Sequence, residues 1–186
     1  MRIMAYTDRR YLRGTLLVVG RDAEVLSSPP WRAQDVSPGM LWGYDVIYID
    51  LHGFQGKDQL YSLEGGAALS GETVRAADLR GTVVVATTCH LPETGLIDAF
   101  LDAGATAVVG GAGDNRGAPR GALWLAGAQL LARFTIERLQ QGWPVESALV
   151  MAKHCVRLSP WRLLGWRAAL DALEFRCFRK ETNTNA

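Results

Sequence analysis

The chain has 186 residues, of which 48% are hydrophobic and 21% are charged, and its formal net charge is +1. This length and composition predict a globular protein with a core of its own and argue against a disordered chain. The near-neutral charge does not indicate a strongly basic surface, so we expect no nucleic-acid partner.

The cysteines and the first residues bear on the cellular compartment. Three cysteines are too few, and odd in number, for a disulfide framework, which favours a reducing compartment. The first ten residues (MRIMAYTDRR) carry charges with no apolar segment behind them, and the longest apolar runs are far shorter than a membrane span. We therefore expect a cytoplasmic protein without a signal peptide or a membrane contact.

Four short apolar runs predict buried strands. They are residues 14–20 (GTLLVVG), 45–51 (DVIYIDL), 81–87 (GTVVVAT) and 105–111 (ATAVVGG). Residues 24–39 contain three prolines and are interpreted mostly as a loop, whereas residues 53–79 are rich in glycine and become helical from about Gly71.

Helices are predicted between and after these strands, at residues 95–104, 122–142 and 144–156. Residues 173–178 (LEFRCF) alternate between apolar and polar and predict a half-buried edge strand. The order of elements predicts an α/β fold with a mainly parallel sheet flanked by helices on both faces. We expect a single domain over residues 1–180, followed by a polar tail at 181–186.

Two of the predicted strands end in residues that carry chemistry. His52 follows the run at 45–51, and Cys89 follows the run at 81–87. The carboxyl ends of parallel strands meet at one edge of the sheet, where binding sites form, and the residues between the two runs suffice for one crossover connection. We therefore expect both side chains at the same edge.

A cysteine and a histidine placed together suit nucleophilic catalysis. A thiol attacks a carbonyl carbon as a thiolate, and an imidazole can take the thiol proton and later protonate a leaving amine. The N–H groups of Gly53 and Cys89 could form an oxyanion hole, worth about 3 kcal/mol per donor in transition-state stabilisation. The alternative is that Cys89 is a small core residue, as most cysteines at buried strand ends are.

Three carboxylates are candidates for substrate binding. Asp50 lies two residues before His52 on the same strand and could orient it or line a pocket for a basic P1 side chain. Asp22 and Asp114 follow the first and fourth predicted strands and could reach the same edge, although each could equally be a solvated turn residue. Arg21, beside Asp22, argues for an acidic P1 residue instead.

Neither a metal nor a cofactor is expected. No spacing of histidines and cysteines suits zinc. Residues 110–117 (GGAGDNRG) suggest a phosphate loop at first sight, but the loop lacks the Gly-Lys-Ser/Thr ending and the register of a dinucleotide fingerprint.

The ordered pieces VIYIDLHG, DLRGTVVVATTC, ETGLIDAFLDAGATAVVGG and ERLQQGWPVESALVMAK cover roughly residues 45–153. In this order they resemble the caspase-like (clan CD) cysteine peptidases, and within them the bacterial CHAT domains. The resemblance implies a caspase-like fold, His52 as general base, Cys89 as nucleophile and Gly53 at the oxyanion. The chain departs from the family's pattern where residues 90–92 (HLP) lengthen the loop after Cys89.

These observations together predict a cysteine endopeptidase acting on protein or peptide substrates, gated by a regulatory partner or by processing. One alternative is a catalytically silent caspase-like scaffold or partner-binding subunit. A flavodoxin-like binder of a nucleotide or small molecule also fits the predicted sheet, but it does not account for the strand ends at His52 and Cys89.

Overall fold

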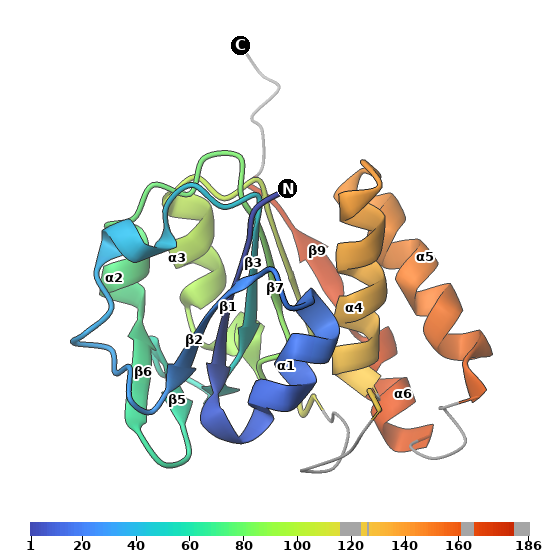
Figure 1. The fold of residues 1–186 in the computed structure, drawn as a ribbon, viewed down its shortest axis with the longest axis horizontal. Helices are drawn as coiled ribbons and strands as arrows, with labels where there is room; N and C mark the ends of the chain where they lie inside the picture. The colour runs from blue at the N-terminus through green and yellow to red at the C-terminus, as the bar shows by residue number, and fades with distance from the viewer. Residues whose placement is uncertain (116–123, 126, 161–165, 181–186) are drawn as a thin grey trace.

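A six-stranded sheet forms the centre of the computed structural model, which describes residues 1–115, 124–125, 127–160 and 166–180 (Figure 1). Its strand order is β2-β1-β3-β7-β8-β9. The strands are β1 (Ile3–Asp8), β2 (Glu24–Ser28), β3 (Val46–Asp50), β7 (Val83–Ala86), β8 (Ala107–Gly110) and β9 (Arg176–Phe178). Neighbours pair in parallel except β9, which runs antiparallel to β8 at the edge. The predicted mainly parallel sheet and its edge strand are therefore confirmed.

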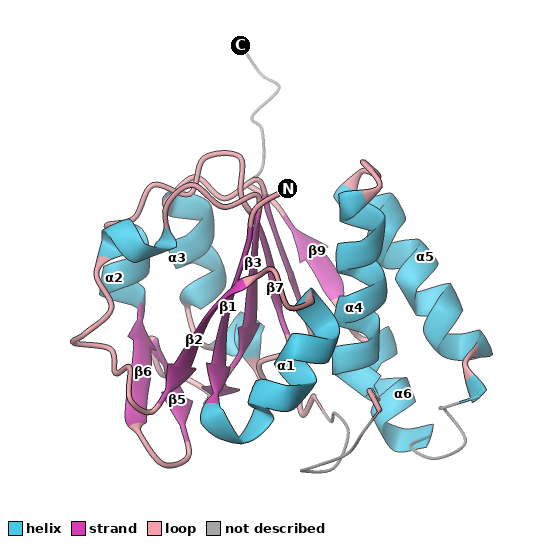
Figure 2. Ribbon diagram, in the orientation of Figure 1, coloured by secondary structure: helices cyan, strands magenta, loops and turns pink. Residues whose placement is uncertain are grey.

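Helices cover both faces of this sheet, as predicted (Figure 2). One face carries α2 (Gly71–Arg75) and α3 (Leu96–Asp102). The other carries α1 (Leu12–Val19), α4 (Gly127–Gln140), α5 (Val145–Leu158) and α6 (Trp166–Leu173). Short 3-10 helices lie at η1 (Arg9–Tyr11), η2 (Pro38–Leu41) and η3 (Leu91–Glu93).

The core divides into two apolar layers because successive side chains of a strand point to opposite faces. In β3, Ile47 and Ile49 belong to the layer under α2 and α3, whereas Val46 and Tyr48 belong to the layer under α4 and α5. Each fully buried aliphatic side chain contributes about 1.5–3 kcal/mol. All residues of β3 are buried, which explains why its sequence is a continuous apolar run.

The sequence analysis was wrong about the first strand. Residues 14–20 form most of helix α1, and the first strand is β1, at the start of the chain. Thr15, Val18 and Val19 are the buried residues of α1, at helical spacing, while Leu16 is exposed. A short apolar run fits a helix or a strand equally well, and here the flanking glycines were misleading.

Two other segments contain strands where loops were expected. Strand β2 lies within residues 24–39, before the prolines. Residues 53–79 contribute a separate antiparallel sheet of β4 (His52–Gly53), β5 (Gln59–Ser62) and β6 (Gly66–Ser70). This small sheet holds His52 by pairing it with Tyr61 of β5.

The remaining predicted elements agree with the structure or fall outside the described residues. Helix α3 ends before Gly104, which has a φ of 98° that glycine adopts readily. The predicted helix at 122–142 is observed from Gly127, and residues 122, 123 and 126 lie outside the described residues, as does the tail at 181–186. Within the described residues no helix has the length and apolar character needed to cross a membrane.

Candidate active site at the carboxyl edge of the sheet

The two strands that precede His52 and Cys89 are neighbours in the sheet. Strands β3 and β7 pair in parallel from Val46↔Val83 to Ile49↔Ala86. The predicted placement of both residues at the carboxyl ends of adjacent parallel strands is therefore confirmed. Whether the two side chains react together stays a prediction.

The backbone after His52 lies directly against the backbone at Cys89. A Cβ added at Gly53 would collide with the carbonyl oxygen of Cys89 and would lie 2.7 Å from Cγ2 of Thr88. Only a residue without a side chain allows this approach. The glycine of the His-Gly pair therefore brings β4 against the loop that carries the thiol, while its predicted oxyanion role stays a prediction.

Cys89 is half-buried, and its sulfur accepts a hydrogen bond from the backbone N–H of Asn115 at 3.3 Å. Burial raises the pKa of the Cys89 thiol, the bond from Asn115 lowers it, and the negative charge of Asp114 raises it further. The net direction is upward, so the neutral thiol is the resting form at neutral pH. The side-chain amide of Asn115 also donates to the carbonyl oxygen of Thr88 at 2.6 Å, which joins the loops after β7 and β8.

The inserted residues after Cys89 are held firmly. Leu91 is completely buried and packs so closely on Gly110 that a Cβ there would collide with it. His90 adopts a left-handed conformation with a φ of 52°, and its N–H donates to Gly113 at 2.8 Å. Its imidazole lies 3.0 Å from Glu93 and 3.3 Å from Asp114. The lengthened loop is therefore anchored on β8 and on the loop that follows it.

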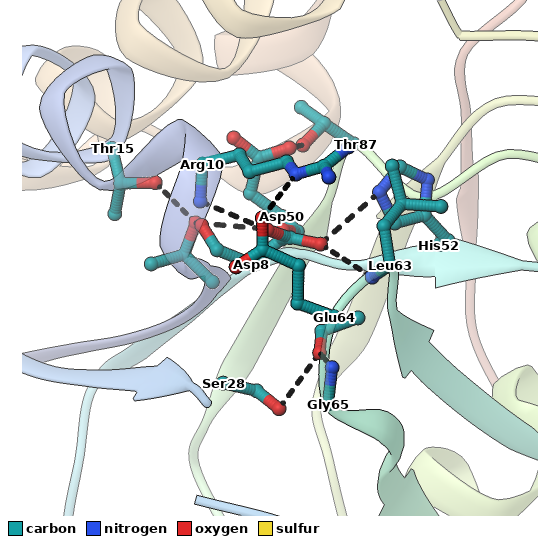
Figure 3. Close-up of polar contacts among 12 residues, drawn as sticks. Asp8, Arg10, Thr15, Ser28, Asp50, His52, Leu63, Glu64, Gly65 and Thr87 are labelled. Atoms are coloured by element: carbon teal, nitrogen blue, oxygen red, sulfur yellow. Dashed lines mark hydrogen bonds and ion pairs between the residues drawn. The ribbon is translucent and has the colours of Figure 1, made fainter. Parts of the chain in front are cut away.

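His52 lies between a carboxylate and an aromatic ring. Its Nε2 atom is 3.4 Å from Oδ2 of Asp8, within ion-pair distance, but the geometry of the contact does not give a hydrogen bond (Figure 3). The ring of Tyr11 is tilted by 51° against the imidazole, with the ring centroids 5.5 Å apart. Burial raises the pKa of the Tyr11 hydroxyl, and the negative charges of Asp50 and Asp8 raise it further. Tyr11 thus packs on the imidazole and lies close enough to both carboxylates to be affected by their charge.

Asp8 and Tyr11 were missed by the sequence analysis. Asp8 ends β1, and Tyr11 ends the single turn η1 that follows. The signal was present, since an apolar run (IMAYTD) ends in an acidic residue in the same manner as the run that ends at Asp50. It was overlooked because the first strand was assigned to residues 14–20.

Asp50 lies at the end of β3, but its carboxylate faces the protein interior. Thr87 donates to Oδ1 at 2.9 Å, and Gln129 of α4 donates to Oδ2 at 3.1 Å. Burial raises the pKa of Asp50, while these two hydrogen bonds and the charge of His52 lower it. Asp50 is therefore a buried structural carboxylate whose oxygens bind protein groups, and this contact pattern does not favour the predicted pocket for a basic side chain.

The other two predicted carboxylates lie at different ends of the sheet. Asp22 follows α1 and precedes β2, near Arg2 and Ile3 at the amino end of β1, so it cannot reach the carboxyl edge as predicted. The error follows from the misassigned first strand. Asp114 does reach the predicted edge, where it lies beside His90 and acts on the Cys89 thiol. The prediction of a basic P1 residue therefore depends on Asp114 alone.

No group of three histidine, cysteine or acidic side chains within the described residues could hold a metal ion. Neither the protein-family models nor the curated proteins include a match to this chain. Functional interpretation therefore depends on the chemistry of the carboxyl edge.

Proposed function

We propose that this chain is a cysteine endopeptidase of the caspase-like type, with Cys89 as nucleophile and His52 as general base. The observation that carries the proposal is the contact between the two strand ends: β3 and β7 are parallel neighbours, and Gly53 packs on the carbonyl of Cys89. A thiol and an imidazole that follow neighbouring strands are suited to acyl transfer once they are aligned, because the sheet fixes the backbones that carry them.

In the proposed reaction, His52 takes the thiol proton as the sulfur of Cys89 attacks the carbonyl carbon of a peptide bond. The tetrahedral intermediate collapses when the same proton passes to the leaving amine, which gives an acyl-enzyme and a new amino terminus. Water then attacks the thioester, and His52 accepts a proton from that water and returns it to the sulfur. The proposed oxyanion donors are the N–H groups of Gly53 and Cys89.

The raised pKa of Cys89 determines how His52 would act. A preformed ion pair would need a thiol pKa below that of the imidazolium, whereas burial and nearby carboxylates move the Cys89 pKa upward. His52 would therefore remove the proton during the attack. The barrier would be lower in a state where the thiol is less buried or a carboxylate is neutralised, which fits gating by a partner or by processing.

The same observation favours the second candidate, a catalytically silent scaffold. A half-buried thiol with a raised pKa is a weak nucleophile and suits a structural cysteine. In this case the carboxyl edge would position loops for a protein partner, and Cys89 would contribute only to packing.

Labelling with a peptidyl acyloxymethyl ketone distinguishes the two candidates, with the adduct mapped by mass spectrometry. The endopeptidase predicts an adduct on Cys89 that is lost in His52→Ala and retained in the double variant Cys155→Ser, Cys177→Ser. Labelling that is equal on all three thiols, or that does not depend on His52, would favour the scaffold.

A further inference from the structure

Asp8 is a completely buried carboxylate at the end of β1, and three groups meet on it (Figure 3). The backbone N–H of Arg10 donates to its Oδ1 at 2.8 Å, and the backbone N–H of Leu63 donates to its Oδ2 at 2.7 Å. The third group is Nε2 of His52, 3.4 Å from Oδ2. A buried carboxylate is costly unless it is hydrogen-bonded, and the two backbone N–H groups supply those bonds, while His52 lies at ion-pair distance without a hydrogen bond.

Each of these interactions acts on an element that touches His52. The bond to Arg10 caps η1, the turn that ends at Tyr11, whose ring packs on the imidazole. The bond to Leu63 holds the residue that follows β5, the strand that pairs with His52. The contact with Nε2 is direct. Asp8 is therefore placed to control both the position of the imidazole and the ring nitrogen that carries its proton.

We propose that Asp8 is the positioning residue for His52, holding the neutral imidazole with its proton on Nε2 so that Nδ1 is the proton acceptor. A neutral imidazole has one donor and one acceptor nitrogen, and a carboxylate 3.4 Å from Nε2 selects the form with the proton on that atom. The acceptor Nδ1 then serves the Cys89 thiol. This assignment rests on the proposed function for its catalytic consequence, but the tautomer can be measured without any activity.

The tautomer is read directly from the ¹⁵N chemical shifts of the imidazole in the full chain above neutral pH. The chain has only three histidines, so loss of signals in His52→Gln identifies the resonances. The wild-type protein should show protonated Nε2 and unprotonated Nδ1. In Asp8→Asn, which loses the charge and one acceptor oxygen, the preference should fall to a mixture, and Asp8→Glu should restore it in part.

Thr15→Val is the matched control. Thr15 is buried near the same strand end and donates to Thr7 at 2.8 Å, so its replacement removes one buried hydrogen bond without removing a contact to His52. It should leave the tautomer unchanged. The proposal is overturned if wild-type His52 is protonated on Nδ1, a result that does not depend on any variant folding. It is also overturned if Asp8→Asn folds and keeps the wild-type tautomer.

Peptidase kinetics provide the second readout. Asp8→Asn should lower kcat by about 10²-fold or more with little change in KM, since general-base catalysis contributes about 10²–10⁴-fold. Thr15→Val should lower neither. If the wild-type chain has no peptidase activity, but its His52 shows the Nε2-protonated tautomer and loses that preference in Asp8→Asn, the positioning role of Asp8 is supported and the proposed function is not. The two failures are therefore distinguishable.

Discussion

Gly53→Ala tests the contact on which the proposed site depends. The added Cβ would collide with the carbonyl oxygen of Cys89 and would lie 2.7 Å from Cγ2 of Thr88 and 3.3 Å from Cγ2 of Thr94. The carbonyl belongs to the backbone and cannot rotate away, so β4 or the loop after β7 must move. Overpacking of this kind costs about 1–3 kcal/mol.

Two opposing effects determine how far Gly53→Ala lowers the free energy of unfolding. Replacing glycine by alanine stabilises a protein by about 0.4–1 kcal/mol through the unfolded chain, where the native backbone conformation permits it. We therefore expect Gly53→Ala to lower the free energy of unfolding by about 1–2 kcal/mol and Tm by about 2–8 °C, given about 2–4 °C per kcal/mol for a chain of this size. Gly39→Ala is the matched control, because a Cβ there meets no atom within 4 Å, and it should leave Tm unchanged or raise it.

Thermal and urea unfolding followed by circular dichroism measure both variants. A Tm for Gly53→Ala equal to that of Gly39→Ala would refute the close approach of the two strand ends. Thr88→Ser offers a further check, since it removes the methyl group but leaves the carbonyl of Cys89 in place. The double variant Gly53→Ala, Thr88→Ser should recover part of the lost stability, and strictly additive losses would contradict the geometry.

Three further predictions follow from the polar groups of the edge. Cys89→Ala should abolish peptidase turnover with a small change in Tm, and Cys155→Ala should leave turnover unchanged; activity surviving in purified Cys89→Ala would show that another group is the nucleophile. Because the pKa of Cys89 is raised, its alkylation by iodoacetamide should keep accelerating above pH 9, and Asp114→Asn should move this profile to lower pH; coincident profiles would exclude the charge effect. Burial raises the pKa of Asp50 in the folded protein above its pKa in the unfolded chain. Above the folded-state pKa, the buried ionised carboxylate therefore lowers the free energy of unfolding, and this loss disappears as the pH falls to the pKa of the unfolded chain. The stability lost in Asp50→Asn should therefore be smaller at pH 8 than near pH 4 in urea titrations, and the opposite order would contradict the sign of the shift.

The sequence predicts the sheet best where strands are buried on both faces. Strands β3, β7 and β8 read as continuous apolar runs because neighbouring strands and helices enclose them. Residues 14–20 read the same way, yet they form a helix with one face against the sheet. The short strands of the small sheet were missed because their stability comes from pairing with one another, a long-range property that composition does not reveal.

The same distinction separates the site residues that the sequence predicted from those that it did not. His52 and Cys89 were found because each follows a recognisable strand, and the structure makes those two strands, β3 and β7, neighbours in the sheet. Asp8 contacts His52 from a strand 44 positions earlier in the chain, through the β1–β3 pairing. The misassigned strand therefore produced both errors: it hid Asp8 and placed Asp22 at the wrong end of the sheet.

The carboxylates near His52 and near Cys89 have opposite effects on the proposed proton transfer. In the proposed reaction, the carboxylate of Asp8 would stabilise the imidazolium that forms when His52 takes a proton, whereas Asp114 and Asp50 would disfavour the thiolate of Cys89. The proposed proton transfer would therefore be assisted at the base and opposed at the nucleophile. Asp114 lies beside His90 at the surface, and a cationic side chain from a substrate or a partner that came near it would weaken that opposition without disturbing the contact between buried Asp8 and half-buried His52. A peptidase built in this way would be slow at rest and faster when a positive charge is bound, whereas a scaffold would show no such dependence.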